Sequence, residues 1–474
     1  MFSFNYLYIN NKKIGMIEMK VCKFGGTSVA SAEQIKKVAA IVKSDPSRKI
    51  IVVSAPGKRF DEDEKVTDLL IKLATAAQKT EDVEVELEEV VHRYRSIAQG
   101  LDLGEDIISV IENDLRERLD SNREDASLFI DCIKAAGEDN NAKLIAAYFN
   151  HIGVEAQYAS PKEAGLLVNN RPERVRALDE GYDRLEKLRE APGLVIFPGF
   201  FGFTEDGTLR TFNRGGSDIT GSLVAAAIRA ELYENFTDVD SVFTANPTVV
   251  DQPVAIDKMT YREMGELAYA GFSVFHDEAL MPAFLRSVPV CIKNTNNPDA
   301  PGTMIVSDRD HSSQPVIGIA ADSGFSTLFV YKYLMNQEIG FGRRLLEILE
   351  DEEIPYEHTP SGIDNLSVII RSKFLNEKNS ERIVQRIKEE LEADDVHLRS
   401  TDYSMVVLVG EGMRHTKGLA ARAASAISRT GANIEMINQG SSEVSLVFGV
   451  DKKDETKILR ELYTEFFQKA TLLA

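Results

Sequence analysis

KFGGTS, residues 23–28, lies between a short apolar stretch and a longer amphipathic one. Val21-Cys22 predicts the end of a buried strand, and the apolar residues after the glycines recur with helical spacing. A strand that turns at glycines into a helix directs backbone N–H groups and a positive helix end at one point, where phosphate binds well. Lys23 adds a full positive charge there. The residues expected to be buried on the helix are Val29, Ile35, Val38, Ile41 and Val42.

This turn is not a Walker A loop, because that pattern places its lysine after the second glycine. Taken alone, a Gly-Gly turn is more often a simple connection between a strand and a helix than a binding site. A second glycine turn, NRGGSD at 213–218, changes this interpretation. It again precedes a predicted helix, and Arg214 offers a planar fork suited to a carboxylate or phosphate. Ser217 or Asp218 could instead cap the helix. Two such turns, one led by Lys and one by Arg, favour an anionic ligand between them.

Length, composition and charge limit the class of protein. The chain has 474 residues, which suggests about three domains. Its formal net charge of −20 argues against a nucleic-acid-binding protein, because such binding depends on Lys and Arg neutralising phosphates. Three widely separated cysteines form no zinc or disulfide pattern and fit a reducing cytoplasm. No apolar run reaches the ~18 residues of a membrane span. Residues 1–18 lack a signal-peptide core and predict a loose extension before Met19.

From Lys20 to about Ser307, short β-branched apolar runs alternate with helical stretches. The pattern predicts a three-layer α/β sandwich with a mostly parallel sheet, whose ligands gather at the carboxyl ends of the strands. The runs read as strands are residues 50–54, 194–197 and 288–292, and those read as helices are residues 142–149 and 222–229.

After about Ser313 a duplicated unit follows. Residues 340–370 read helix, strand, strand, and residues 418–448 read the same way after a shift of 78 positions (340 to 418). In the first copy the strands are 355–358 and 366–370. Each copy is preceded by a strand and followed by a helix. The pattern therefore predicts two β-α-β-β-α units of the α+β, ferredoxin-like kind. The alternative is that both copies are packing modules without a ligand.

Three further polar stretches could carry chemistry, and each also has an ordinary structural explanation. TDVDSVF (237–243) ends a strand and suits a nucleotide, or is a plain turn. GE (137–138) is read as a helix start with a carboxylate at its mouth, where Glu138 could simply complement the helix dipole. The histidines form no ligand pair, and no Ser-His-Asp or Cys-His arrangement is present. The inventory suits electrostatic phosphoryl transfer to a carboxylate, which needs no general base because it is already ionised.

Taken in order, these motifs resemble those of the aspartokinases, in the amino acid kinase superfamily. The matching runs are KFGGTS (23–28), VVSAPG (52–57), KVTDLL (65–70), GE (137–138), FNRGGSD (212–218), TDVDSVF (237–243), IKNTNNP (292–298) and APGT (300–303). The paired tail units resemble the ACT domains that follow this catalytic domain. The resemblance covers Met19 to Leu473 and points to the monofunctional, lysine-sensitive type. It implies a loose extension at 1–18, a kinase domain at 19–310, and ACT domains at 311–400 and 401–474, the last segment of which can return to the first.

The resemblance implies transfer of a phosphoryl group from ATP to the β-carboxylate of L-aspartate (EC 2.7.2.4), with Mg²⁺ held mainly by the phosphates and no protein metal cage. The catalytic residues would be Lys23 and Asp218, with Asp218 organising Lys23. The substrate residues would be Thr67, Glu138, Arg214, Gly215, Gly216 and Ser217, with Glu138 facing the ammonium and Arg214 a carboxylate. The nucleotide residues would be Lys23, Phe24, Gly25, Gly26, Thr237, Asp238, Phe243, Thr248, Ser273 and Val274.

The sequence departs from the family pattern at two nucleotide positions. A basic residue is often present where Thr248 stands here, and the family's GAKVLH segment reads GFSVFH at 271–276. Two positive contacts to ATP are therefore missing or supplied elsewhere, and we interpret the change as variation within one branch of the family.

The tail implies feedback control in the pathway to lysine, threonine, methionine and diaminopimelate. The resemblance places the effector, lysine rather than threonine, near Met335, Gly340, Phe341, Tyr356 and Glu357, and implies a cytoplasmic homodimer or tetramer that pairs through the ACT domains. Threonine, or both amino acids, stays open as the effector. Two other functions also stay open: a kinase of the same fold acting on glutamate, carbamate or a nucleotide, and a non-catalytic amino-acid sensor with a decayed ATP site. ACT units used for dimerisation alone would predict no effect of lysine or threonine.

Overall fold

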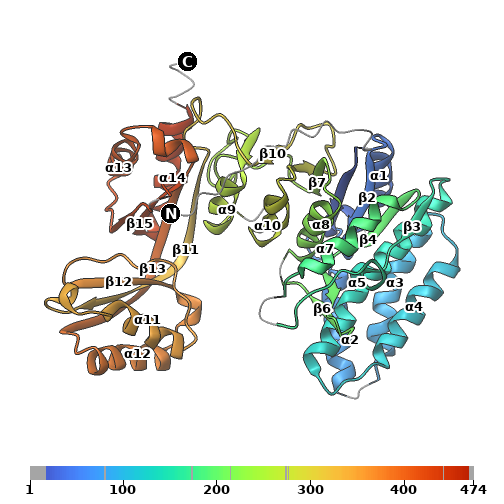
Figure 1. The fold of residues 1–474 in the computed structure, drawn as a ribbon, viewed down its shortest axis with the longest axis horizontal. Helices are drawn as coiled ribbons and strands as arrows, with labels where there is room; N and C mark the ends of the chain where they lie inside the picture. Colours follow the sequence, from blue (N-terminus) through green and yellow to red (C-terminus); the bar gives the residue numbers. More distant parts are fainter. Residues whose placement is uncertain are drawn as a thin grey trace. The chain divides into compact units, whose positions relative to one another are not determined.

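The computed structural model describes residues 18–79, 82–171, 175–213, 215–272, 275, 277–440 and 442–468. Within these ranges, every helix is too short or too polar to cross a lipid bilayer. The chain forms two compact units (Figure 1). The first comprises Met1–Ser241 and Phe275–Ser307, and the second comprises Val242–Val274 and Asp308–Ala474.

The first unit is built on a sheet with the strand order β3-β4-β2-β1-β7-β9-β10. Neighbouring strands are parallel except for β10, which runs antiparallel to β9. The strands are β1 (Lys20–Phe24), β2 (Arg48–Val53), β3 (Ala156–Tyr158), β4 (Leu194–Pro198), β7 (Leu232–Thr237), β9 (Val290–Asn294) and β10 (Thr303–Val306), and β5 (Phe201–Phe203) and β6 (Leu209–Thr211) form a separate hairpin.

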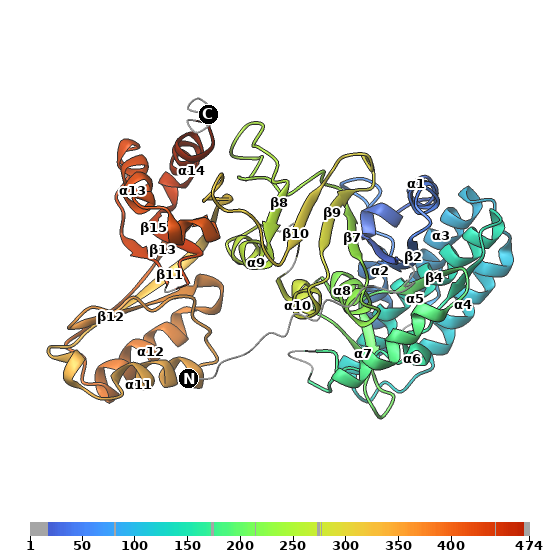
Figure 2. The same ribbon diagram turned by 45° about the horizontal axis from the view of Figure 1, so that its top comes forward.

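Helices cover both faces of this sheet (Figure 2). Cys22 and Phe24 of β1 face one helical layer and share a core with it. That layer consists of α1 (Ala32–Lys43), α2 (Val66–Gln78), α3 (Glu84–Gly100), α4 (Glu105–Leu119) and α5 (Ala126–His151). On the other face, α8 (Gly216–Ala227) packs on β1, β2 and β7, and α10 (Asp277–Arg286) packs on α8. The short helices α6 (Pro161–Ala164) and α7 (Asp179–Leu185) precede β4. The predicted three-layer sandwich is confirmed.

Two local predictions in this unit concern the start of a helix: the first holds, with a later start for the α-helix, and the second is wrong. The glycine turn at 23–28 opens a 3₁₀ helix, Gly26–Val29, and α1 begins only at Ala32, after Ser31 as its N-cap. Residues 137–138 do not start a helix, because α5 already begins at Ala126 and runs through them. Gly137 lies inside this helix, at a point where α5 passes close to the loop after β2. A Cβ on Gly137 would lie 2.9 Å from Cβ of Ala55.

The second unit contains an antiparallel five-stranded sheet with the order β12-β11-β13-β15-β14. Its strands are β11 (Gly318–Tyr331), β12 (Asn365–Arg371), β13 (Asp395–Val409), β14 (Met436–Asn438) and β15 (Ser445–Asp451). Its helices are α9 (Tyr261–Tyr269), α11 (Phe341–Asp351), α12 (Glu377–Glu390), α13 (Leu419–Arg429) and α14 (Glu455–Tyr463), and β8 (Lys258–Thr260) precedes α9.

Two apolar cores lie along this one sheet. The first joins α11 and α12 to β12 and the adjoining parts of β11 and β13, and the second joins α13 and α14 to β15 and the remaining parts. Val316 and Ile319, which precede the first repeat in sequence, belong to the second core. The long strands β11 and β13 therefore connect the two copies of the predicted ferredoxin-like unit. The strand predicted at 355–358 is absent, and only His358 makes an isolated bridge, to Ile369.

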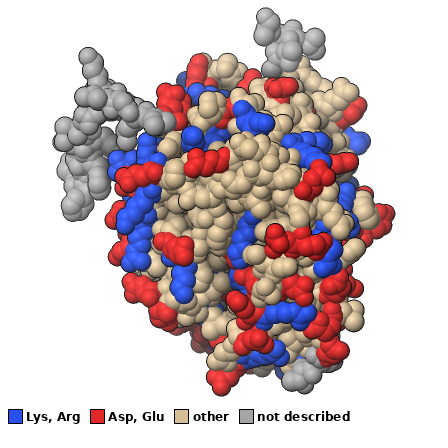
Figure 3. All heavy atoms as spheres, turned by 90° about the vertical axis from the view of Figure 1, so that its right-hand side faces the viewer, with Lys and Arg blue, Asp and Glu red and all other residues tan. Residues whose placement is uncertain are grey.

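On the surface, charges of both signs are interspersed. On the face drawn in Figure 3, Lys and Arg side chains alternate with Asp and Glu side chains around an uncharged area. Arg116 of α4, for example, pairs with Glu84 and Glu112 at 2.8 and 3.0 Å. On this face the negative net charge is therefore not gathered into one field.

Candidate active site

Lys23 and Asp218 form a buried ion pair across two layers of the first unit. Lys23 Nζ lies 2.6 Å from Asp218 Oδ1, and Lys23 is only 7% exposed. Lys23 is near the end of β1, and Asp218 is in the first turn of α8. Asn235 of β7 donates from Nδ2 to the same oxygen at 2.7 Å. The two residues predicted as catalytic are thus brought together, with an asparagine that the sequence analysis did not select.

The glycine loop after β1 packs closely on the loop after β2. A Cβ on Gly26 would lie 3.1 Å from the carbonyl oxygen of Ala55, and the Gly57 N–H donates to the Gly26 carbonyl at 2.9 Å. The Gly25 N–H donates to the carbonyl of Phe236 at 3.0 Å. Phe24 is fully buried and stacks on Phe236 at a centroid distance of 4.7 Å. The glycines thus permit close backbone packing, and the Gly25 N–H is already used within the protein.

Glu138 is a buried carboxylate at the same edge of the sheet. It is 6% exposed, and its Oε2 has no hydrogen-bond partner. Burial raises the pKa of Glu138 to about 7, while hydrogen bonds with the backbone of Ala55 and the side chain of Ser217 act in the opposite direction. Glu138 of α5, Ala55 of the loop after β2 and Ser217 of α8 therefore converge. A buried, half-satisfied carboxylate is suited to an ammonium group.

The second glycine turn has the geometry that its sequence suggests. Gly215 is in the left-handed region with φ +72°, and α8 begins at Gly216. A Cβ on Gly216 would lie 2.6 Å from Cδ2 of Phe200, so the backbone approaches the preceding loop closely. Neither Ser217 nor Asp218 caps the helix, since both lie inside its first turn. Arg214 lies outside the described residues. Thr67 is the second residue of α2 and is half-buried.

Thr237 and Asp238, two of the predicted nucleotide residues, lie where β7 ends, beside the end of β9. Thr237 Oγ1 donates to Asp238 Oδ1 at 3.1 Å, and the Thr295 N–H donates to the Thr237 carbonyl at 3.0 Å. Asn294 of β9 donates from Nδ2 to Oδ1 of Asp240 at 2.7 Å. These polar groups lie at the carboxyl edge of the sheet, next to the end of β1.

The other predicted nucleotide residues belong to the second unit. Phe243 is half-buried and bridges to Ala255. Thr248 is exposed, and its N–H and hydroxyl both donate to Asn246 Oδ1, at 2.9 and 2.8 Å. Ser273 and Val274 lie outside the described residues.

The five predicted effector residues have different environments. Met335 and Phe341 are 7% and 3% exposed and lie in the first core of the tail, so their side chains pack inside the protein. Gly340 precedes α11 with φ +82°. Tyr356 is 47% exposed, whereas Glu357 pairs with Arg371 at 2.8 Å.

A polar groove of about 1200 Å³ crosses the sheet of the tail, and the sequence analysis did not find it. Its charged lining combines Arg399, Lys452 and Lys453 with Glu435 and Asp451. The complete lining is Thr327, Phe329, Pro360, Ser367, Ile369, His397, Arg399, Tyr403, Asn433, Glu435, Met436, Asp451, Lys452 and Lys453.

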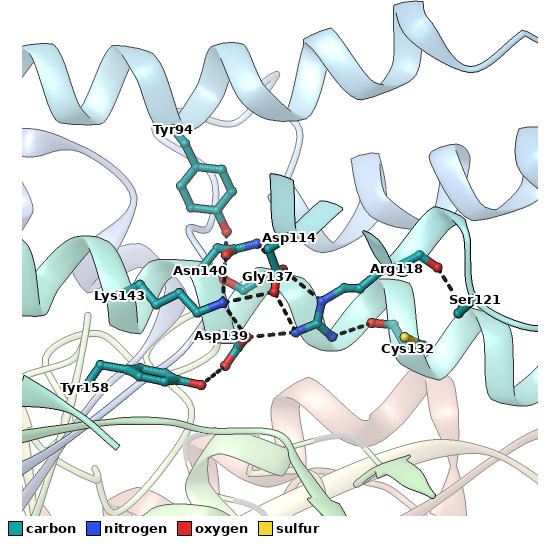
Figure 4. A network of polar contacts seen from close by, with 10 residues as sticks. All are labelled: Tyr94, Asp114, Arg118, Ser121, Cys132, Gly137, Asp139, Asn140, Lys143 and Tyr158. Carbon is teal, nitrogen blue, oxygen red and sulfur yellow. Dashed lines mark hydrogen bonds and ion pairs between the residues drawn. The ribbon is translucent and has the colours of Figure 1, made fainter. Parts of the chain in front are cut away.

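A buried polar network lies on the α4 side of the turn that carries Glu138 (Figure 4). Asp139 accepts from Tyr158 at 2.5 Å and pairs with Arg118 at 2.7 Å and Lys143 at 3.0 Å. Asp114 of α4 joins the network through Arg118, Asn140 and Lys143. Tyr94 donates to the carbonyl of Gly137 at 2.7 Å. These contacts connect α5 to α3, α4 and β3, and they hold in place the part of α5 that carries Glu138.

Comparison with known proteins identifies the family. Residues 18–294 match the amino acid kinase family, and residues 406–466 match an ACT domain. The chain is 54% identical over 449 residues to aspartokinase 3 of Bacillus subtilis, with 95% of this chain and 99% of that protein covered. The chain belongs to the aspartokinase family. Its enzyme class is therefore that of an aspartate kinase with ACT domains.

Solved structures of other aspartokinases have the same fold. The aspartate kinase of Clostridium acetobutylicum is 34% identical with a TM-score of 0.84, over 94% of this chain and all of that chain. Aspartokinase III of Escherichia coli, solved in complex with aspartate and ADP, is 24% identical with a TM-score of 0.77, over 95% of this chain and all of that chain. At 24% identity, the similarity to the Escherichia coli structure is evidence for a shared fold alone.

Proposed function

We propose that this aspartokinase transfers the γ-phosphoryl group of ATP to the β-carboxylate of L-aspartate, yielding 4-phospho-L-aspartate and ADP. The observation that carries the proposal is the buried Glu138 carboxylate, with one unpaired oxygen, at the sheet edge where the Lys23–Asp218 pair also lies. An ammonium group on the substrate would satisfy that oxygen. A zwitterionic amino acid is thereby favoured over carbamate or a nucleotide as the phosphoryl acceptor.

In this proposal the substrate carboxylate is itself the nucleophile. It is ionised at neutral pH, so the reaction forms a C–O–P bond and breaks the bond between Pγ and the bridging oxygen without a general base. Lys23 stabilises the charge on the transferred group, and Asp218 fixes Lys23. Thr67, Glu138, Arg214 and the turn Gly215-Gly216-Ser217 hold aspartate. Arg214 would bind the α-carboxylate.

The proposed nucleotide site comprises Phe24, Gly25, Gly26, Thr237, Asp238, Phe243, Thr248, Ser273 and Val274. Gly25 would contribute by allowing the backbone to approach, since its N–H is bonded to Phe236. Mg²⁺, held mainly by the ATP phosphates, would neutralise part of their charge. Asp218 would act on Lys23, because one of its carboxylate oxygens lies beside Lys23 Nζ and accepts from Asn235.

The ACT pair is proposed to bind lysine as the feedback effector in a cytoplasmic homodimer or tetramer. The domain boundaries are those expected above, with the kinase domain at 19–310 and the ACT domains at 311–400 and 401–474. Gly340, Tyr356 and the polar groove are the exposed candidates for effector contact, since the groove offers both charge signs to a zwitterion. The pathway role, toward lysine, threonine, methionine and diaminopimelate, follows from the product.

The test measures ADP release with Mg-ATP and either L-aspartate or L-glutamate, with lysine and threonine added separately and together. Turnover with aspartate that lysine suppresses is the expected result. Turnover with glutamate alone would overturn the substrate. A rate unaffected by either effector would leave the tail as a dimerisation module. ATP binding without turnover would support the sensor alternative.

A further inference from the structure

Asn235 is a buried amide next to the candidate catalytic lysine. It lies in the middle of β7 and is 2% exposed. In the parallel pairing of β1 with β7, Asn235 is the register partner of Lys23. Paired residues on adjacent strands point to the same face of a sheet. Both side chains therefore face α8, where Asp218 lies.

Asp218 is held by β7 at both its side chain and its backbone. Its Oδ1 accepts from Asn235 Nδ2 at 2.7 Å and lies 2.6 Å from Lys23 Nζ. The hydroxyl of Tyr233, two residues before Asn235 on the same face, donates to the Asp218 carbonyl at 3.3 Å. Gly221, one turn further along α8, allows this approach, because a Cβ there would lie 2.5 Å from the Tyr233 hydroxyl.

Two donors on one oxygen fix the rotation of the Asp218 carboxylate, and with it the position of Lys23 Nζ. A neutral amide does this without adding charge. A carboxylate at position 235 would compete with Asp218 for Lys23, and an aliphatic side chain would leave the carboxylate oxygen with one donor fewer at a buried site.

We propose that Asn235 is a positioning residue for phosphoryl transfer, acting through Asp218 on Lys23. The inference rests on the proposed function, because it assigns Lys23 to the transferred phosphoryl group. It extends that function to a residue that contacts neither substrate.

The experiment measures kcat, KM for both substrates and the pH profile of kcat for Asn235→Leu and Asn235→Asp. A double-mutant cycle combines Asn235→Leu with Asp218→Asn, because a residue that acts through Asp218 has little effect once Asp218 is changed. The control is Asn150→Leu. Asn150 lies in the last turn of α5, outside the network that holds Glu138, and donates from Nδ2 to the carbonyls of Ala146 and Ala156 at 2.9 and 2.7 Å.

We expect Asn235→Leu to lower kcat by roughly ten- to a hundredfold, as for the loss of a hydrogen bond to a charged group. In the Asp218→Asn background the same change should cost less than about threefold. Asn235→Asp should add an ionisation to the pH profile, because two adjacent carboxylates cannot both ionise freely. Asn150→Leu should reduce stability and leave that profile unchanged.

Wild-type kcat in Asn235→Leu, or full additivity with Asp218→Asn, would overturn the proposal. Both results require an active parent enzyme, so they are distinct from failure of the proposed function. That failure would appear as no turnover of aspartate by the unsubstituted chain.

Discussion

The hydroxyl of Ser28 lies 2.7 Å from the hydroxyl of Thr295, and both side chains are buried. This bond joins the loop after β1 to the loop after β9. Backbone bonds from Gly57 to Gly26, from Gly25 to Phe236 and from Thr295 to Thr237 connect the loops between them. The carboxyl ends of four strands thus form one hydrogen-bonded edge, and a site built there is held in place before substrate arrives.

Removing either hydroxyl of the Ser28–Thr295 hydrogen bond should lower the stability of the fold. Ser28→Ala or Thr295→Val should each lower the free energy of unfolding by about 1–3 kcal/mol, because the other hydroxyl loses a partner in a buried position. The double variant should cost less than the sum, with a coupling of about 0.5–1 kcal/mol. Urea unfolding followed by circular dichroism gives these values, which is convenient since the chain has no tryptophan. Additive losses would show that the hydroxyls do not depend on each other.

Glu138 should give aspartate binding a pH dependence. Its pKa of about 7 leaves it largely protonated, and unable to pair with an ammonium, in more acidic solution. We expect kcat/KM for aspartate to fall by up to about tenfold per pH unit below about pH 7. Glu138→Gln should lower kcat/KM and flatten the profile. Glu84→Gln, at an exposed ion pair with Arg116, is the control and should keep the parent profile. A flat profile in the unsubstituted enzyme would contradict the role of Glu138.

The same carboxylate should destabilise the fold at high pH. Its folded-state pKa lies above the ~4.3 of an unfolded chain, so the folded protein binds the proton more tightly. This contribution is fully favourable below about pH 4 and is lost as the pH rises through about 7, a change of roughly 3 kcal/mol. The stability of Glu138→Gln relative to the parent should therefore increase from about pH 5 to about pH 8. Urea midpoints across that range measure it, and a constant difference would exclude the effect.

Gly137 tests the close packing beneath Glu138. In Gly137→Ala the new methyl would lie 2.9 Å from Cβ of Ala55 and 3.2 Å from Cδ1 of Leu70. We expect a loss of about 1–3 kcal/mol in unfolding free energy and a higher KM for aspartate, because α5 must shift. Gly265→Ala is the control, since a Cβ in that α9 position meets nothing within 4 Å and gains up to ~1 kcal/mol of helix propensity. Equal stabilisation in both variants would show that α5 tolerates the methyl group.

Local sequence patterns located the two glycine turns of the candidate site, because a turn is formed by residues that are neighbours in the chain. The roles of the individual residues were implied by the family resemblance. Asn235 was missed because its contact with Asp218 depends on the register of β1 and β7 and on the placement of α8, which no local pattern contains. The available signal was an amide side chain in a strand expected to be buried, since a buried amide needs a partner.

The wrong local predictions share a cause. The sequence predicts a helix start at residues 137–138, yet α5 runs through Gly137, where close tertiary packing leaves no room for a side chain. The sequence of the repeat predicts a strand at residues 355–358, but only Glu357 and His358 form backbone hydrogen bonds with β12, both to Ile369. In both cases a neighbouring element, absent from the local pattern, decides the structure.

Aspartyl-hydroxamate formation in Lys23→Met, beside the parent and Lys20→Met, tests the central claim most directly. Lys20 is on the same strand and makes a partly exposed ion pair with Asp45 at 2.7 Å, so it controls for loss of a lysine from β1. We predict product in the parent, activity within about twofold in Lys20→Met, and a loss of roughly a thousandfold in Lys23→Met. No aspartyl hydroxamate from the parent, or normal turnover in Lys23→Met, would contradict phosphoryl transfer to aspartate at this site.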